Sequence, residues 1–285
     1  MPYRFKQKLR PCLPSASQTA ADFQLADDGR SAPLLKVARL SVRFGGISAL
    51  DDVSFNVERG QICGLIGPNG AGKTTLFNCL SRLYDASSGS IVFEGTELLN
   101  MPAHAIAGLG ISRTFQNLAL FKSLTVLDNV KLGASAWTKT GFLAHALRMP
   151  WVARKEDEID DAARYVIHEV GLERDQDRPV SQLNFAVQKM VELARALVAR
   201  PKLLLLDEPA GGLNHEEVAA LGDLICRLQA RLGLSILLVE HHLNLVMRIS
   251  DKVVALNFGR KIADGPPKAI QDDGAVVQAY LGTAV

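Results

Sequence analysis

Long hydrophobic runs, paired cysteines and a strong excess of one charge are all absent from this sequence of 285 residues. No apolar run reaches the ~20 residues that a membrane-spanning helix needs. The formal net charge is +2, so the molecule as a whole is not built to attract nucleic acid. The four cysteines form no C-x-x-C pair, which predicts free thiols in a reducing cytosol. With 48% apolar and 22% charged residues, the composition indicates an ordinary soluble globular protein.

Regular hydrophobic periodicity is also missing from the first 34 residues. Basic side chains cluster at the very start, and several prolines and serines follow them. No apolar segment of a secretory signal peptide accompanies the basic start. We therefore expect residues 1–34 to be a disordered tail, with contact to an anionic membrane as the alternative, and residues 35–285 to form the folded domain.

A glycine-rich stretch lies between a predicted buried strand at residues 62–66 and a predicted helix at residues 75–80, and it matches the pattern G-x-x-x-x-G-K-[ST]. Its glycines let successive backbone N–H groups turn toward one anion, and the helix N-terminus adds its partial positive charge. Lys73 is placed to reach the β- and γ-phosphates of a nucleotide, and the Thr74 hydroxyl to bind Mg²⁺. The residues of this predicted nucleotide-binding loop are Gly67, Pro68, Asn69, Gly70, Ala71, Gly72, Lys73, Thr74 and Thr75.

Two carboxylates follow a run of four leucines at residues 203–206. Such a run predicts a strand buried on both faces of a parallel sheet, and ligands of open α/β sheets bind at the carboxyl ends of the strands. In this interpretation Asp207 supports the hydrated Mg²⁺, and Glu208 orients or deprotonates the attacking water. His241 follows another predicted buried strand, at residues 235–239, and we expect it on the γ-phosphate side of the same edge.

The segments around these motifs predict the rest of an α/β fold. Alternating residues at 35–44 and a second strand at 50–57 predict a small antiparallel sheet before the nucleotide core. Phe44 lies at the tip of that sheet, where it either stacks on an adenine ring or belongs to the core. Residues 117–187 are mostly helical in character, and strands and helices alternate after residue 200, which implies a parallel sheet. Further predicted elements are strands at residues 89–94, 253–257 and 260–263, an amphipathic helix at 154–170, a capped helix from Asn214, and short helices at 102–107 and within 266–281.

In this order the motifs resemble those of the ATP-binding subunits of ABC transporters. The resemblance covers about residues 35–285. It implies a P-loop NTPase (RecA-like) α/β core with an N-terminal antiparallel β subdomain and an inserted helical subdomain at about residues 117–200. It also implies hydrolysis of ATP with Mg²⁺ and no nucleic-acid partner.

The resemblance carries roles over to single residues. Phe44 is similar to the aromatic residue that stacks on adenine, and Asp207 to the Walker B acid. Glu208 is similar to the catalytic glutamate, and His241 to the switch histidine that contacts the γ-phosphate. Gln116 resembles the Q-loop glutamine that senses Mg²⁺ and couples to the membrane subunit. The ligands of Mg²⁺, partly through water, would be Thr74, Gln116 and Asp207.

Short stretches elsewhere are similar to one subfamily, the LivG type, which drives uptake of branched-chain amino acids. They are residues 43–46, 67–78, 113–116, 240–247 and 279–282. The resemblance implies two membrane permease subunits, a second ATP-binding subunit that is identical or different, and a periplasmic solute-binding protein as an indirect partner. It places the chain peripherally on the cytoplasmic face of the inner membrane. Lipopolysaccharide or lipid export, urea or amide uptake, and a non-transport ABC ATPase stay open as alternatives.

One motif departs from the family pattern. The family signature is L-S-G-G-Q, or L-x-[YF]-G-x-Q in this subfamily, and here Asn184 takes the place of its serine and Ala186 that of its second glycine. The methyl group of Ala186 lies where the family brings the backbone close to the nucleotide of the partner subunit. The resemblance therefore predicts two unequal composite ATP sites if the partner is a different ATPase. The signature residues are Leu183, Asn184, Phe185, Ala186, Val187 and Gln188.

Overall fold

The computed structural model describes residues 32–114, 118–136 and 150–281. Most of the tail expected at residues 1–34 lies outside the described residues, and so does Gln116. Leu34 differs from the expectation, because its side chain is fully buried. Its carbonyl oxygen accepts a hydrogen bond from the Glu94 N–H at 3.0 Å. Packing of the chain therefore begins before residue 35.

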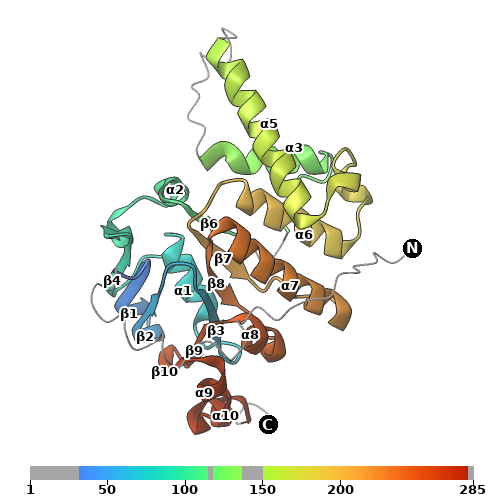
Figure 1. Ribbon diagram of the computed structural model, residues 1–285. Helices are drawn as coiled ribbons and strands as arrows, with labels where there is room; N and C mark the ends of the chain where they lie inside the picture. Colours follow the sequence, from blue (N-terminus) through green and yellow to red (C-terminus); the bar gives the residue numbers. More distant parts are fainter. Residues whose placement is uncertain (1–31, 115–117, 137–149, 282–285) are drawn as a thin grey trace, which may run out of the picture. The chain divides into compact units, whose positions relative to one another are not determined.

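One antiparallel sheet has the strand order β2-β1-β4-β5. Strands β2, β1 and β4 lie side by side in Figure 1. The β1–β2 hairpin turns at the predicted pair of glycines, and its register pairs Phe44 with Ile47. Strand β2 begins earlier than predicted, since Ile47 and Ser48 already pair with the end of β1. The small sheet expected before the nucleotide core is therefore present, and it is extended by two later strands. The strands are β1 (Leu35–Phe44), β2 (Ile47–Val57), β4 (Ser88–Phe93) and β5 (Thr96–Glu97).

Among the described residues, six strands form the central sheet in the order β10-β9-β3-β8-β7-β6. Neighbours from β9 to β6 are parallel, which confirms the parallel sheet expected from the alternation, and β10 is an antiparallel edge. Strand β6 is too short to show an alternating pattern, and the sequence did not predict it. The strands are β3 (Ile62–Ile66), β6 (Ile111–Arg113), β7 (Leu203–Asp207), β8 (Ser235–Val239), β9 (Lys252–Asn257) and β10 (Arg260–Gly265).

The leucines of β7 pack on both faces of the central sheet, as their unbroken run predicts. Leu203 and Leu205 join one core with helix α1 and the antiparallel sheet. Leu204 and Leu206 join the core on the opposite face with helices α6, α7 and α8. The helix that follows the nucleotide loop therefore packs in one core with both sheets. The helices are α1 (Lys73–Leu80), α6 (Phe185–Leu197), α7 (His215–Leu232) and α8 (Leu243–Ile249).

The chain between β6 and β7 forms a layer of helices (Figure 1). In this layer α3 (Val126–Leu132) and α5 (Pro150–Val170) pack against each other and against α6. Helix α5 begins earlier than predicted, and it buries the predicted apolar face through Ala163, Val166 and Ile167. Gly171, with a φ of 81°, follows the end of α5. From there the chain runs through two single 3₁₀ turns to α6, so this stretch is less helical than its composition suggested. The turns are Glu173–Asp175 and Val180–Gln182.

The short helices predicted near residues 102–107 and 266–281 are present. They are α2 (Ala103–Ile106), α9 (Pro267–Gln271) and α10 (Gly274–Leu281), and further 3₁₀ turns lie at Leu98–Asn100, Ala107–Leu109 and Gly133–Ala136. Within the described ranges, no helix is long and apolar enough to cross a membrane.

Three of the four cysteines fall in the described chain, and all three are buried and outside any disulfide, as predicted. Burial raises the pKa of Cys63 to about 12 and that of Cys79 to about 11. These thiols therefore stay protonated at neutral pH and act as small apolar core residues. Cys12 lies outside the described residues.

Candidate functional site

The nucleotide loop connects β3 to α1 through backbone conformations that glycine adopts easily. Gly67 has a φ of 152° and Gly72 a φ of 101°. A Cβ on Gly67 would lie 2.2 Å from the Leu256 carbonyl oxygen, and one on Gly72 would lie 2.7 Å from the Ala49 carbonyl oxygen. Both glycines are therefore required by close backbone contacts as well as by their dihedral angles. The motif has the strand–loop–helix context that its sequence predicted.

The side chain of Lys73 folds back and binds the start of the nucleotide loop. Its side chain is buried, and its Nζ donates hydrogen bonds to the carbonyl oxygens of Gly67 at 2.6 Å and Pro68 at 3.0 Å. Burial lowers the pKa of Lys73, and the negative charges of Glu208 and Asp207 oppose that shift. The loop thus contains a cation held by carbonyl oxygens, and Thr74 beside it is exposed at the start of α1.

Asp207 ends β7 and is held by an arginine that the sequence did not single out. Arg113 Nη2 donates to Asp207 Oδ2 at 2.7 Å, and Arg113 Nη1 donates to Asn78 Oδ1 at 2.9 Å and to Ser81 Oγ at 3.2 Å. The guanidinium also lies over the Phe77 ring, 5.5 Å from its centroid. Arg113 therefore ties the helix that follows the nucleotide loop to the predicted metal-supporting acid. No local signal could have found it, because β6 (Ile111–Arg113) is too short to be recognised from its sequence.

Glu208 and His241 meet side chain to side chain. Glu208 Oε1 lies 2.5 Å from His241 Nε2. Glu208 has a φ of 49°, a left-handed conformation that is uncommon for a residue with a Cβ. Its N–H donates to the Val239 carbonyl oxygen at 2.9 Å, which fixes the turn after β7 against the end of β8. Strained backbone of this kind clusters at active sites.

Glu240, directly after β8, is buried and joins the loop that follows β7 to the loop that follows β8. Its Oε1 accepts the Ala210 N–H at 2.5 Å and its Oε2 accepts the His241 N–H at 3.0 Å. The loop after β7 then starts α7, where Asn214 and Glu217 form the predicted capping box. A buried carboxylate therefore sets the spacing between the loop that carries Glu208 and the loop that carries His241.

The signature stretch is the start of α6. Asn184 is the N-cap, and its Oδ1 accepts the Val187 N–H at 2.9 Å. Gln188 Nε2 donates to the Leu183 carbonyl oxygen at 2.8 Å. Phe185 is 47% exposed. The side-chain oxygen of Asn184 is thus engaged within its own helix, and the apolar ring beside it faces outward.

Lys189 links α6 to the Glu208 turn. Its Nζ donates to the Glu208 carbonyl oxygen at 3.1 Å and lies 5.5 Å from the centroid of the Phe185 ring. A Cβ on Gly212 would lie 2.8 Å from the same ring, so the loop after β7 also touches α6. The signature residue Phe185, and Lys189 directly after the signature, therefore contact the loop that follows β7 and carries Glu208.

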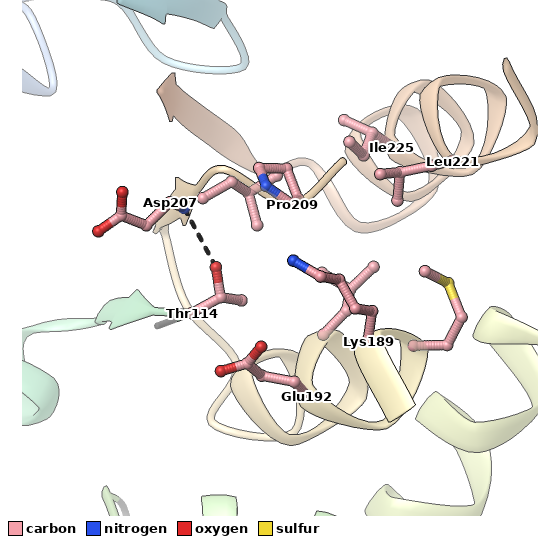
Figure 2. Close-up of a pocket in the computed structure, with 10 residues that line it drawn as sticks. Thr114, Lys189, Glu192, Asp207, Pro209, Leu221 and Ile225 are labelled. Carbon is pink, nitrogen blue, oxygen red and sulfur yellow. Dashed lines mark hydrogen bonds between the residues drawn. The ribbon is translucent and has the colours of Figure 1, made fainter. Parts of the chain in front are cut away.

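A small cavity lies behind Asp207, between α6, the end of β7 and α7 (Figure 2). Thr114, Lys189 and Pro209 line it, and the Thr114 hydroxyl accepts the Asp207 N–H at 3.2 Å. The lining includes no residue of the nucleotide loop. This cavity adjoins the predicted catalytic edge without being the nucleotide site.

The remaining predicted site residues are Phe44 and Gln116. Phe44 is 46% exposed and contacts Tyr84 edge to face, with ring centroids 5.2 Å apart. Its hairpin continues to Ala49, which packs on Gly72, so the exposed ring belongs to a hairpin that touches the nucleotide loop. Gln116 lies outside the described residues.

Comparisons with known families agree with this arrangement. A family model described as ABC transporter matches residues 50–211. A second model, described as Branched-chain amino acid ATP-binding cassette transporter, matches residues 260–285. The two matches together span the nucleotide loop, the end of β7 and the C-terminal helices.

Relatives and solved structures match over most of the chain. The high-affinity branched-chain amino acid transport ATP-binding protein BraF of Pseudomonas aeruginosa is 42% identical over 254 residues, which is 89% of this chain and 100% of its own. The corresponding LivG of Escherichia coli strain K12 is 40% identical over the same shares.

Two crystal structures are similar in fold and 29% identical in sequence. One is a nucleotide-free ATP-binding cassette from an ABC transporter, with a TM-score of 0.74 over 87% of this chain and 98% of its own. The other is the ADP conformation of an ATP-binding cassette of an ABC transporter, with a TM-score of 0.76 over 88% of this chain and 100% of its own. This chain therefore belongs to the ATP-binding cassette family of ABC transporter ATPases, together with the branched-chain amino acid transport ATP-binding proteins.

Proposed function

We propose that this chain hydrolyses ATP with Mg²⁺ to drive uptake of branched-chain amino acids, as a peripheral subunit on the cytoplasmic face of the inner membrane. The observation that carries the ATPase part is the 2.5 Å contact between Glu208 and His241. This contact lies at the carboxyl ends of β7 and β8, in the same sheet as β3, which the nucleotide loop with Lys73 follows. The names of the relatives and the C-terminal family match support the solute.

The roles of the side chains follow from their positions. Lys73 is held by carbonyl oxygens that a phosphate oxygen can replace, so its cation is available to the β- and γ-phosphates. Glu208 is the group to orient or deprotonate the attacking water. His241, in contact with Glu208, contacts the γ-phosphate and keeps the Glu208 carboxylate directed toward that water. Phe44 offers its exposed ring to adenine.

The residues present fit Mg²⁺. The described chain contains no group of three or more His, Cys, Asp or Glu side chains placed to hold a metal ion. Proteins bind Mg²⁺ through one or two carboxylates together with substrate phosphates, so such a group is not needed. Thr74 and Asp207, with Gln116, would hold the ion partly through water. When bound there, Mg²⁺ offsets the negative charge of the phosphates.

The signature segment supports a second ATP-binding subunit as partner. Phe185 is 47% exposed, and the helix start at Asn184 has its own bonds satisfied locally. We propose that residues 183–188 contact the nucleotide of that partner, and that the Ala186 methyl makes this composite site the slower one. Two permease subunits and, indirectly, a periplasmic solute-binding protein complete the proposed complex.

Reconstitution tests the proposal. The tagged chain is purified from its own membranes with the subunits that accompany it, and the complex is placed in proteoliposomes with the solute-binding protein. We expect uptake of radiolabelled leucine that needs both ATP and Mg²⁺ and is lost in a Lys73→Ala complex. ATP hydrolysis that responds to lipopolysaccharide, lipid or urea, with no leucine uptake, would instead identify one of the related transport systems.

A further inference from the structure

A tyrosine near the C-terminal end of the described chain binds the first residue of the nucleotide loop. Tyr280, in α10, accepts a hydrogen bond from the Gly67 N–H through its phenol oxygen at 2.8 Å. This contact joins the last helix to the loop that begins directly after β3. None of the predicted site residues lies in α10, so the contact is additional to the site described above.

The Gly67 amide needs such a partner. The β3 ladder with β9 ends where Ile66 pairs with Ala255, and Gly67 is the next residue. Gly67 is buried, and its backbone passes so close to the Leu256 carbonyl oxygen that a Cβ would lie 2.2 Å from it. A buried N–H beyond the end of a ladder must find another acceptor, and the Tyr280 oxygen supplies it.

The other side of the same residue is bound by the phosphate-binding lysine. The Gly67 carbonyl oxygen accepts a hydrogen bond from Lys73 Nζ at 2.6 Å. When Lys73 turns to a phosphate, that carbonyl loses its strongest neighbour. The Tyr280 bond does not depend on Lys73, so it can hold the loop while the lysine changes partner.

Helix α10 is fixed well enough to act as such a support. Val276 and Ala279 are buried, and Val276 belongs to the same hydrophobic core as the buried Ile270 of α9. Burial raises the pKa of Tyr280, so its phenol stays neutral throughout the physiological range. The second family model, residues 260–285, covers this whole segment.

We propose that Tyr280 is a positioning residue of the nucleotide loop, through which α10 holds the Gly67 peptide in the geometry that binds ATP. The inference rests on the ATP-binding part of the proposed function and is independent of the transported solute. Because coupling between two sites is reciprocal, ATP should also steady α10 through the same bond.

Tyr280→Phe removes the phenol oxygen and keeps the ring. In the isolated full-length chain we expect the affinity for a fluorescent ATP analogue to fall roughly two- to tenfold, as for the loss of one neutral hydrogen bond. Hydrogen exchange should become faster in the peptide that contains Gly67, and ATP should protect the peptides of α10 less than in the wild type. In the assembled transporter, the KM for ATP should rise while kcat at saturating ATP stays close to that of the wild type.

Two control variants separate positioning from general stability. Tyr165→Phe makes the same chemical change on an exposed face of α5 and should leave ATP affinity unchanged. Val276→Ala loosens the packing of α10 and keeps the phenol, so it should lower the melting temperature without matching the loss of ATP affinity.

The outcomes are decisive for the inference. Equal losses of affinity in Val276→Ala and Tyr280→Phe would make Tyr280 a packing residue and overturn the proposal. Unchanged ATP affinity and unchanged exchange at Gly67 in Tyr280→Phe would overturn it as well. A wild-type chain that binds no ATP would instead overturn the proposed function, so the two failures are distinguishable.

Discussion

The nucleotide loop and the signature segment bind the same kind of ligand in the proposed complex, yet they are built in opposite ways. The loop is tied to its own chain at several points: Gly67 by Tyr280 and Lys73, and Ala71 by the Gly259 N–H at 3.1 Å. The signature segment uses its bonds within one helix start and leaves Phe185 47% exposed. The first region has the form of a preorganised site, and the second that of a surface completed by another molecule.

The largest effect is expected from removing the cation of the preorganised region. Lys73→Ala should weaken ATP binding by on the order of 10³-fold, because two charge-assisted hydrogen bonds to phosphate are lost. Equilibrium dialysis with ATP measures this. Lys36→Ala, an exposed lysine on β1, is the matched control and should bind normally. Binding of ATP by Lys73→Ala at wild-type affinity would remove the contrast between the two regions.

Breaking the Arg113 contact should affect stability next. Arg113→Met leaves the Asp207 carboxylate, which is 4% exposed, without its cationic partner. Loss of one member of a buried ion pair costs roughly 3 kcal/mol of unfolding free energy. Urea unfolding measures the cost, and Arg113→Met combined with Asp207→Asn should recover part of it. If the double variant were less stable than Arg113→Met alone, the pair would not be the source of the loss.

In the proposed function the chemical step depends on Glu208. Glu208→Gln should keep ATP binding and slow hydrolysis by ~10²-fold or more, since the general base is lost while the shape of the side chain is retained. Measurements of phosphate release and of ATP affinity on the same preparation separate the two effects. Normal turnover in this variant would exclude Glu208 as the base.

A smaller effect is expected from a substitution in the signature segment. Ala186→Gly removes the methyl group at the exposed helix start, and we expect the ATPase rate of the assembled complex to rise a few-fold. In the isolated chain the same change should cost about 0.5–1 kcal/mol of unfolding free energy, because glycine disfavours a helix. An unchanged rate in the complex would show that the methyl group is tolerated and that the two composite sites are not unequal for this reason.

The smallest effect on stability is expected at Glu94, which forms surface ion pairs outside both the nucleotide loop and the signature segment. Glu94 lies between Arg59 at 2.7 Å and Lys202 at 2.5 Å, and its hydrogen bonds to these two groups lower the pKa of its carboxyl from the ordinary 4.5. A lowered pKa gives stability that is fully present above pH 4.5 and is lost as the pH falls through the folded-state value.

Glu94→Gln should therefore reduce the unfolding free energy at pH 7 by under about 1 kcal/mol. The wild type and the variant should converge in acid. Urea titrations at pH 7 and below pH 4 compare them, and a difference that grows on acidification would contradict the assignment.

The elements around the nucleotide loop could be predicted from the sequence. Strand β3, the loop and α1 carry their signals locally, in an apolar run, two glycines and a lysine, and the structure has them where the pattern put them. The capping box at Asn214 is equally local. The parallel pairing of the central strands followed from the alternation of strand and helix, whereas their order in the sheet was not predicted.

Contacts between distant segments could not be predicted in the same way. The bond between Tyr280 and Gly67 spans 213 positions, and the bond between Arg113 and Asp207 spans 94. Neither partner has a neighbour pattern that marks the other, because such pairs are fixed by how helices and strands pack. Lys189 is a third case, since a lysine in a helix is ordinarily predicted to face solvent, and here it is buried against the Glu208 carbonyl.

The left-handed backbone of Glu208 bears on why this position holds a glutamate rather than a glycine. A residue with a Cβ at a φ of 49° costs of order 1 kcal/mol or more relative to glycine, so the fold alone would favour glycine at that position. Glu208→Gly should accordingly melt no lower than the wild type while losing hydrolysis, which calorimetry on the isolated chain can check. With Glu208 in its proposed role, the chain keeps a less stable residue at this turn, and thermal stability is traded for turnover.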